Sequence, residues 1–129
     1  MRFFLAVLSF AGLLSQALAE DIAREARSGQ PTSLFVFSIY SIGTCTAGPL
    51  AEPKIIRQGQ NGVVRISASS SLLDARQCGS LKAWGQNVVY TSRPGFRGSD
   101  QIVVEFAYNP TVEAPRLTST RYTVTINVR

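Results

Sequence analysis

The two cysteines of this 129-residue chain, Cys45 and Cys78, have the side chains best suited to covalent chemistry. Only one pairing is possible. A bond between these two cysteines closes a loop of about 34 residues, and the chain-entropy estimate of its contribution to stability is roughly 3–4 kcal/mol. A redox-active pair is the alternative, but the chain has no Cys-x-x-Cys motif and no histidine to lower a thiol pKa. We therefore predict a structural disulfide.

Catalytic chemistry has few candidate residues. The absence of histidine removes the commonest general base, the commonest zinc ligand and the Ser-His-Asp triad. No Gly-x-Ser-x-Gly elbow and no phosphate-binding glycine loop are present. The carboxylates lack the Asp-x-Asp clustering of a calcium site, and Asp100 and Glu105 tend towards opposite faces of one strand. We expect no enzymatic activity, no catalytic or metal site and no cofactor.

Residues 1–19 have the pattern of a secretory signal peptide. Arg2 supplies the positive start, and residues 3–14 form an apolar run too short to span a bilayer. Ala17-Leu18-Ala19 fits the small-x-small cleavage rule, so the mature chain is expected to begin at Glu20. An uncleaved anchor is the alternative. We expect an exported protein, periplasmic or extracellular, without a membrane span after cleavage.

The mature chain is mildly basic. Without Arg2 it holds twelve basic and eight acidic residues, a surplus of four positive charges. Such a surplus favours an acidic partner or an anionic envelope polymer. However, the basic residues are scattered singly, which is typical of ordinary solvated surface. Nucleic acid is not an expected partner, because the chain has no basic stripe.

A tight loop between two strands, within residues 90–106, is the most specific structural signal. Arg93-Pro94-Gly95-Phe96 has the residues of a type II turn, because Pro94 presets φ at the second position and Gly95 supplies the positive φ of the third. Gly98 permits a second reversal. Phe96 is expected to turn inward, and Asp100 to accept hydrogen bonds from nearby backbone amides.

This stretch resembles a motif of bacterial immunoglobulin-like and cadherin-like surface repeats, Tyr-x-Pro-x-x-Gly-Phe-x-Gly-x-Asp-x-Phe-x-Tyr. Ser92 stands where the family has proline, and Ile102 and Val104 stand where it prefers aromatics. The resemblance implies a β-sandwich in a stalk, an adhesive module or a secreted domain. Cadherin-like relatives often bind calcium between tandem repeats, for which this chain lacks the carboxylates. The matching residues are Tyr90, Gly95, Phe96, Gly98 and Asp100.

The rest of the chain reads as short strands separated by turn signals. Residues 34–42 are apolar and β-prone, and Gly59-Gln60-Asn61-Gly62 predicts a hairpin between strands at 54–58 and 63–68. Residues 69–83 are predicted to be a long irregular connection that holds Cys78. The final strand alternates cleanly, with apolar residues at Tyr122, Val124, Ile126 and Val128.

These signals predict an all-β fold, an antiparallel immunoglobulin-like β-sandwich of six to seven strands with one disulfide. A small barrel is the alternative. The sandwich domain is expected to cover residues 34–129. Residues 20–33 are expected to form an N-terminal tail or a short helix.

Two places could bind a partner. A lone tryptophan beside a disulfide is typical of a core, so Trp84 is expected inside, with a sugar-binding platform as the alternative. The connection at residues 109–118 is too long for a tight turn and is expected to be an exposed contact loop. Its candidate contact residues are Pro110, Val112, Glu113, Pro115 and Arg116.

The sequence therefore favours an exported, non-catalytic domain that binds a protein or an envelope component. A secreted hydrolase inhibitor is the first alternative, because a rigid disulfide-bridged scaffold lowers the ordering cost of binding. A carbohydrate-binding module that uses Trp84 is the second. The sequence names neither the partner nor the oligomeric state.

Overall fold

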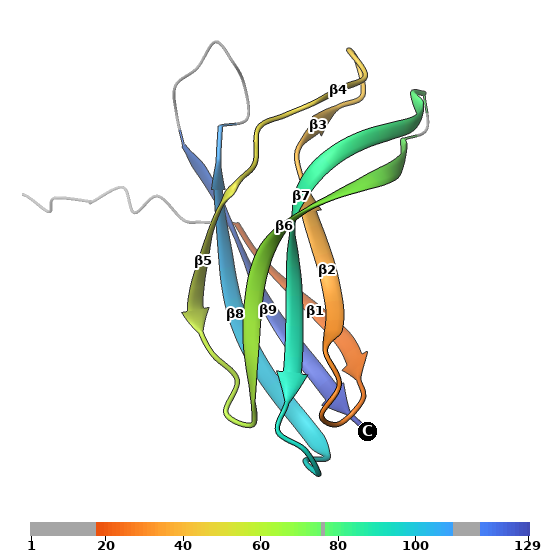
Figure 1. Ribbon diagram of the computed structural model, residues 1–129. Helices are drawn as coiled ribbons and strands as arrows, with labels where there is room; N and C mark the ends of the chain where they lie inside the picture. The colour runs from red at the N-terminus through yellow and green to blue at the C-terminus, as the bar shows by residue number, and fades with distance from the viewer. Residues whose placement is uncertain (1–17, 76, 110–116) are drawn as a thin grey trace, which may run out of the picture.

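The computed structural model describes residues 18–75, 77–109 and 117–129, and within these ranges it contains strands and turns but no helix (Figure 1). Most of the described chain lies in long strands. Several of these strands extend beyond the alternating apolar residues from which the sequence predicted them. The strands are β1 (Leu18–Ala26), β2 (Thr32–Ser38), β3 (Tyr40–Ser41), β4 (Thr46–Ala47), β5 (Glu52–Arg57), β6 (Gly62–Ala75), β7 (Gly79–Ser92), β8 (Gly98–Tyr108) and β9 (Thr118–Val128).

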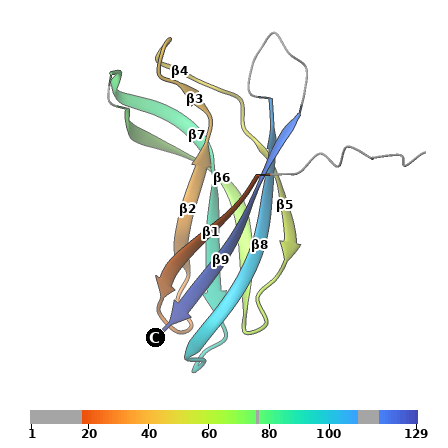
Figure 2. The same ribbon diagram turned by 180° about the vertical axis from the view of Figure 1, so that it is seen from behind.

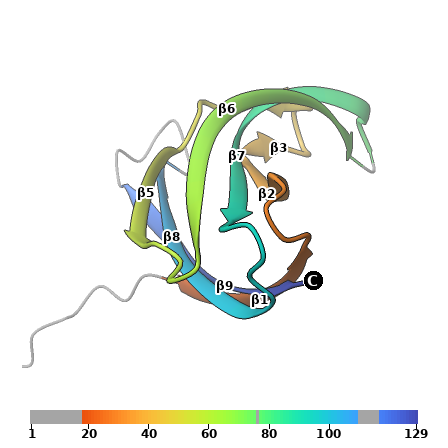
Figure 3. The same ribbon diagram turned by 60° about the horizontal axis from the view of Figure 1, so that its bottom comes forward.

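Seven long strands form two sheets that pack face to face (Figure 3). One sheet has the order β1-β9-β8-β5, the other has the order β2-β7-β6, and β3 and β4 form a separate two-stranded ribbon. All pairings are antiparallel except that of β1 with β9. The fold is an all-β, immunoglobulin-like sandwich, as the sequence predicted.

The core lies between the inward faces of the two sheets, where every second residue is buried from Gln86 to Ser92 in β7, from Asp100 to Phe106 in β8 and from Val124 to Val128 in β9. Aromatic rings fill its middle: the Phe37 ring stacks on the Phe106 ring with centroids 4.5 Å apart, and the Phe35 ring lies 5.1 Å from that of Tyr122. The largest fully buried side chains are Tyr90, Phe106, Ile102, Ile126, Val64, Val88, Val104 and Val124.

The N-terminal segment differs from the prediction. Residues 20–33 form neither a tail nor a short helix, because β1 runs from Leu18 to Ala26 and pairs with β9 along its whole length (Figure 2). Backbone pairing with β9 outweighs the weak local preference of this polar segment. The sandwich therefore begins at β1 and not at residue 34. The predicted signal peptide lies outside the described residues, apart from Leu18 and Ala19 at the start of β1.

The expected hairpin between residues 54–58 and 63–68 is also wrong. β5 pairs with β8 in one sheet and β6 pairs with β7 in the other, so the connection between β5 and β6 crosses the sandwich. The side-chain amide of Gln58 donates to the Val64 carbonyl oxygen at 3.1 Å and accepts from the Val64 amide at 2.8 Å. This side chain occupies the free edge of β6 where a hairpin partner strand would lie.

The predicted long connection at residues 69–83 is instead the distal part of the β6–β7 hairpin. The register runs without a shift from Gly62 opposite Ser92 to Ala75 opposite Gly79. The three serines at 69–71 resemble a loop in composition, but they occupy ordinary ladder positions. The hairpin is therefore 14 residues long on each side.

The turn after β7 confirms the sequence prediction. The Phe96 amide donates to the Arg93 carbonyl oxygen at 3.2 Å, and Gly95 has φ of 83°, as a type II turn requires. Gly98 also has a positive φ, of 133°. The Phe96 ring is partly buried against the core, and the Arg93 guanidinium lies 5.5 Å from its centroid.

Candidate functional site

The candidate site lies at one end of the sandwich, where the β6–β7 hairpin continues beyond the core. On the inward face of β7, Tyr90, Val88 and Gln86 are buried, but Trp84, the next residue of that face, is 54% exposed. The Gln86 amide donates to the Ala51 carbonyl oxygen at 2.9 Å and marks the boundary of the core. Figure 1 shows the far part of the β6–β7 hairpin curving away from the other sheet.

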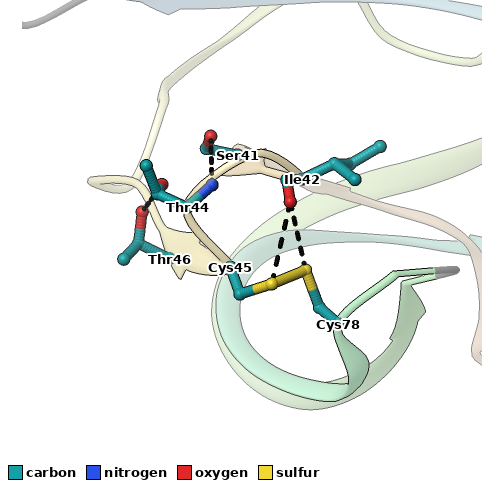
Figure 4. The surroundings of a disulfide bond; sticks show 6 residues. All are labelled: Ser41, Ile42, Thr44, Cys45, Thr46 and Cys78. Atoms are coloured by element: carbon teal, nitrogen blue, oxygen red, sulfur yellow. Dashed lines mark hydrogen bonds between the residues drawn. A yellow bond between two sulfur atoms is a disulfide. The ribbon is translucent and has the colours of Figure 1, made fainter.

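The Cys45–Cys78 disulfide is present and joins this hairpin to the β3–β4 ribbon, with the two Cα atoms 5.4 Å apart (Figure 4). The Ile42 carbonyl oxygen lies 3.3 Å from the Cys78 sulfur and 3.7 Å from the Cys45 sulfur. These are close contacts and not hydrogen bonds, because sulfurs in a disulfide carry no hydrogen. Cys45 has φ of 51°, a left-handed conformation that aims its side chain at the hairpin tip.

β2 and β7 approach closely below the ribbon, at Gly85. A Cβ at this position would lie 2.9 Å from the Phe37 carbonyl oxygen, which real contacts do not allow. Gly85 is paired with Ser38, the last residue of β2, and the ribbon follows directly. The glycine therefore permits the approach that brings Cys45 within reach of Cys78.

Large apolar side chains are exposed at this end, which we call the disulfide end. It comprises residues 39–51, the distal β6–β7 hairpin at residues 69–83, Trp84, and the junctions of β8 and β9 with their connection. Isolated exposed apolar residues are normal, but several at one end of a small domain are a candidate contact surface. They are Tyr40 (41% exposed), Ile42 (45%), Leu50 (44%), Leu72 (70%), Trp84 (54%) and Leu117 (76%).

The expectation that Trp84 lies in the core is therefore wrong. It is opposite Ser70 in the hairpin, and Leu72 follows two residues further along β6 on the same face. The inward face loses its opposing sheet at this point, so its apolar residues meet solvent. The period-two pattern of Val64, Ile66 and Leu72 places these residues on one face of β6, but it does not report where the opposing sheet ends.

The other candidate contact residues, Pro110, Val112, Glu113, Pro115 and Arg116, lie outside the described residues. Their flanks are described: Tyr108 at the end of β8 is opposite Thr118 at the start of β9. This pairing lies at the disulfide end (Figures 1 and 2). The structure thus brings the anchors of the predicted contact loop to the same end as Trp84.

The residues of the motif lie at the opposite end, which we call the Asp100 end. Asp100 is 5% exposed and accepts hydrogen bonds from the amides of Gln60 (3.0 Å), Asn61 (3.1 Å) and Gln101 (2.9 Å). The Tyr90 hydroxyl donates to the same carboxylate at 2.6 Å. The sequence predicted amide donors for Asp100, but it missed Tyr90 and the connection between β5 and β6.

This network shifts the acid–base behaviour of both side chains. Burial by itself raises the pKa of Asp100, but the hydrogen bonds from Tyr90, Gln101, Asn61 and Gln60 outweigh it and lower the pKa below its ordinary value. Burial, and then the hydrogen bond to Asp100 and its charge, raise the pKa of the Tyr90 hydroxyl. The pair is a neutral phenol bound to a carboxylate at neutral pH, which is a structural arrangement.

Known proteins provide no further guide to the site. Comparison of the chain with family models, with curated proteins and with solved structures found no match. Within the described ranges, no three metal-ligating side chains are grouped as a metal ion would need. In the same part of the chain, no helix has the length and apolar character to cross a membrane.

Proposed function

We propose that this chain is an exported, non-catalytic binding domain that contacts a partner protein or another envelope component through its disulfide end. The observation that carries the proposal is the set of exposed apolar side chains there, with Leu72 and Trp84 on one face of the hairpin. Covering such surface releases roughly 25 cal/mol per Å² of apolar area. Tryptophan is also among the residues most often dominant in binding energy.

The disulfide supports both the location and the mode of binding. Disulfides persist in oxidising compartments, which agrees with the signal peptide pattern of residues 1–19. The bond holds the ribbon against the hairpin before a partner arrives, so less conformational entropy is lost on binding. The residues that favour catalysis are few, and we assign this domain no reaction.

The motif around Asp100 supports membership of the bacterial immunoglobulin-like or cadherin-like surface repeats, which we retain as part of the proposal. In the sandwich the residues of the motif form the turn and the hydrogen bonds at the end opposite the contact surface. The motif is therefore part of the scaffold, and the proposed partner contacts the disulfide end.

The test is a comparison of variants in affinity capture. The protein is produced from the full-length sequence, purified oxidised and incubated with the envelope fraction of its source cell, and captured proteins are identified by mass spectrometry. We expect a stoichiometric partner that the double variant Leu72→Ser/Trp84→Ser no longer captures. The control is Val63→Ser, which removes a 52% exposed apolar side chain near the Asp100 end.

The proposal fails if capture survives the double variant, or if Val63→Ser abolishes it equally. A further variant replaces residues 110–116 with Gly/Ser, and unchanged capture would remove that loop from the contact surface. The N-terminal sequence of the exported protein is read in the same preparation. A start at Glu20 is expected, and retention of residues 1–19 would contradict the signal peptide.

One observation favours a second candidate function, glycan binding by Trp84. The side chain is 54% exposed, and exposed aromatic rings are platforms for sugar faces. Trp84 is the single tryptophan of the chain, so its fluorescence reports on this surface alone. Saturable quenching by neutral oligosaccharides that weakens in Leu72→Ser, a variant that keeps Trp84 and removes its neighbour on the same face, would favour glycan over protein. Unchanged emission at millimolar sugar would exclude this candidate.

A further inference from the structure

Arginine residues are concentrated at the Asp100 end. The two lysines of the chain, Lys54 and Lys82, lie elsewhere. Six arginines occupy the ends of strands and the connections that close the Asp100 end, and all six are exposed. They are Arg27, Arg57, Arg65, Arg93, Arg97 and Arg129.

Few carboxylates neutralise these arginines. In the described part of the chain, ion pairs join Arg129 to Glu25 at 2.6 Å and Arg121 to Glu105 at 2.9 Å, and only the first lies at this end. Asp100 is buried and already accepts four hydrogen bonds. The Asp100 end thus holds six arginines and two side-chain carboxylates, those of Glu25 and Asp100. With a free main-chain carboxylate at Arg129 counted as well, the surplus is still three positive charges.

The six arginines line three surface hollows that adjoin one another. The first is lined by Arg27, Arg97 and Arg129, with Glu25 as its carboxylate. The second contains Arg65 and Arg93 and shares Pro31 with the first. The third contains Arg57 and shares Gln60 with the second. Each hollow therefore adjoins the next through one shared residue, and we call this row of three hollows the arginine band.

The lining of the band is mixed in a way that suits a chain-like ligand. Val63, Val89 and Pro31 give the middle hollow an apolar floor between its arginines. Guanidinium groups bind carboxylate, sulfate and phosphate through paired hydrogen bonds, and apolar floors pack against the C–H faces of sugar rings. A linear polymer with anionic groups at intervals would meet both features along the band.

We propose that this arginine band binds a linear anionic polysaccharide. The band lies at the opposite end of the sandwich from Trp84, so both surfaces can be occupied at once. This second site is independent of the proposed function, and it can hold even if the disulfide end binds nothing.

The test uses the full, oxidised protein with fluorescently labelled dextran sulfate, polygalacturonate and neutral dextran, followed by anisotropy at 50 and 300 mM NaCl. We expect saturable binding of the two anionic polymers at low salt, weaker binding at high salt, and none of neutral dextran. Arg27→Gln/Arg93→Gln/Arg97→Gln should weaken binding at least about tenfold. The control Arg24→Gln/Lys54→Gln/Lys82→Gln removes the same charge elsewhere and should change it less than about twofold.

A second pair of variants separates the band from general charge. Val63→Glu places a negative charge in the middle hollow, and Leu72→Glu places one at the disulfide end, both at side chains more than half exposed. Only Val63→Glu should weaken polymer binding. Equal effects of the two, equal effects of the two triple variants, or no binding at 50 mM NaCl would overturn the proposal. Equal or tighter binding to single-stranded DNA or to phosphatidylglycerol vesicles would also overturn it.

Discussion

At the Asp100 end, elements of both sheets meet on one buried carboxylate, whereas at the disulfide end the β6–β7 hairpin extends past the opposing sheet and is tied by Cys45 and Cys78. The first end is closed by hydrogen bonds that burial strengthens. The second has no opposing sheet to bury its residues, and a covalent bond joins its ribbon to the hairpin. The exposed apolar residues therefore lie where a disulfide, and not an opposing sheet, joins the elements.

Removal of the disulfide should have the largest effect on this contrast. Cys45→Ser/Cys78→Ser releases a loop closed by a bond of sequence separation 33, and we expect a loss of about 3–4 kcal/mol in the free energy of unfolding. Denaturant unfolding measures the loss. Acrylamide quenching of Trp84 should show a more accessible disulfide end in the folded variant. A loss below about 1 kcal/mol would mean that the ribbon and hairpin hold together without the bond.

Asp100→Asn should cost almost as much at the other end. The amide side chain keeps the volume but cannot accept all four hydrogen bonds that Asp100 receives, so buried donors lose their partner. We expect a loss of about 3 kcal/mol, measured by denaturant unfolding at pH 7. The matched control is Asp74→Asn, an exposed aspartate of the disulfide end, for which the change should stay within about 0.5 kcal/mol. Equal losses for the two variants would erase the contrast between the ends.

Acid should weaken the Asp100 end selectively. The pKa of Asp100 is lowered in the folded protein, so its stabilisation is complete above the unfolded pKa of about 3.9 and is lost as pH falls through the lower folded value. Thermal melts between pH 5 and pH 2 should show a decline below about pH 4 that is shallower in Asp100→Asn. Identical slopes for both proteins would show that Asp100 does not contribute.

Replacement of Trp84 should have the smallest effect. Truncation of a core tryptophan typically costs about 3–5 kcal/mol, but this side chain is 54% exposed, so Trp84→Ser should change the free energy of unfolding by no more than about 0.5–1 kcal/mol. Far-ultraviolet circular dichroism during denaturation measures it, since the variant lacks tryptophan fluorescence. A loss above about 2 kcal/mol in the free energy of unfolding would indicate that Trp84 packs in the core.

The features that were predictable from the sequence are those encoded within a few residues. The type II turn follows from Pro94 and Gly95, and the alternation at Tyr122 to Val128 identified β9. The pairing of Cys45 with Cys78 followed from there being no other cysteine. Each of these depends on local backbone geometry or on elimination, so no knowledge of distant partners was needed.

The features that were missed depend on partners far away in the sequence. β1 is polar and becomes a strand because β9 supplies its hydrogen-bond partners. The turn residues at 59–62 serve a hairpin and a crossover equally well, so only the pairing of β5 with β8 distinguishes them. The exposure of Trp84 depends on where the opposing sheet ends, which no local pattern reports.

The parallel pairing of β1 with β9 also has a consequence for the order of folding. Ile22 is opposite Val124, so the two strands that lie side by side are separated by about 100 residues of chain. In a polypeptide that is synthesised or threaded through a membrane from its N-terminus, β1 emerges first and its one neighbour within the sheet emerges last. β1 therefore remains unpaired until β9 has emerged. Until β1 pairs with β9, the edge of β9 is open to the β1 strand of another molecule. Strand exchange between nascent chains is the hazard that this topology creates.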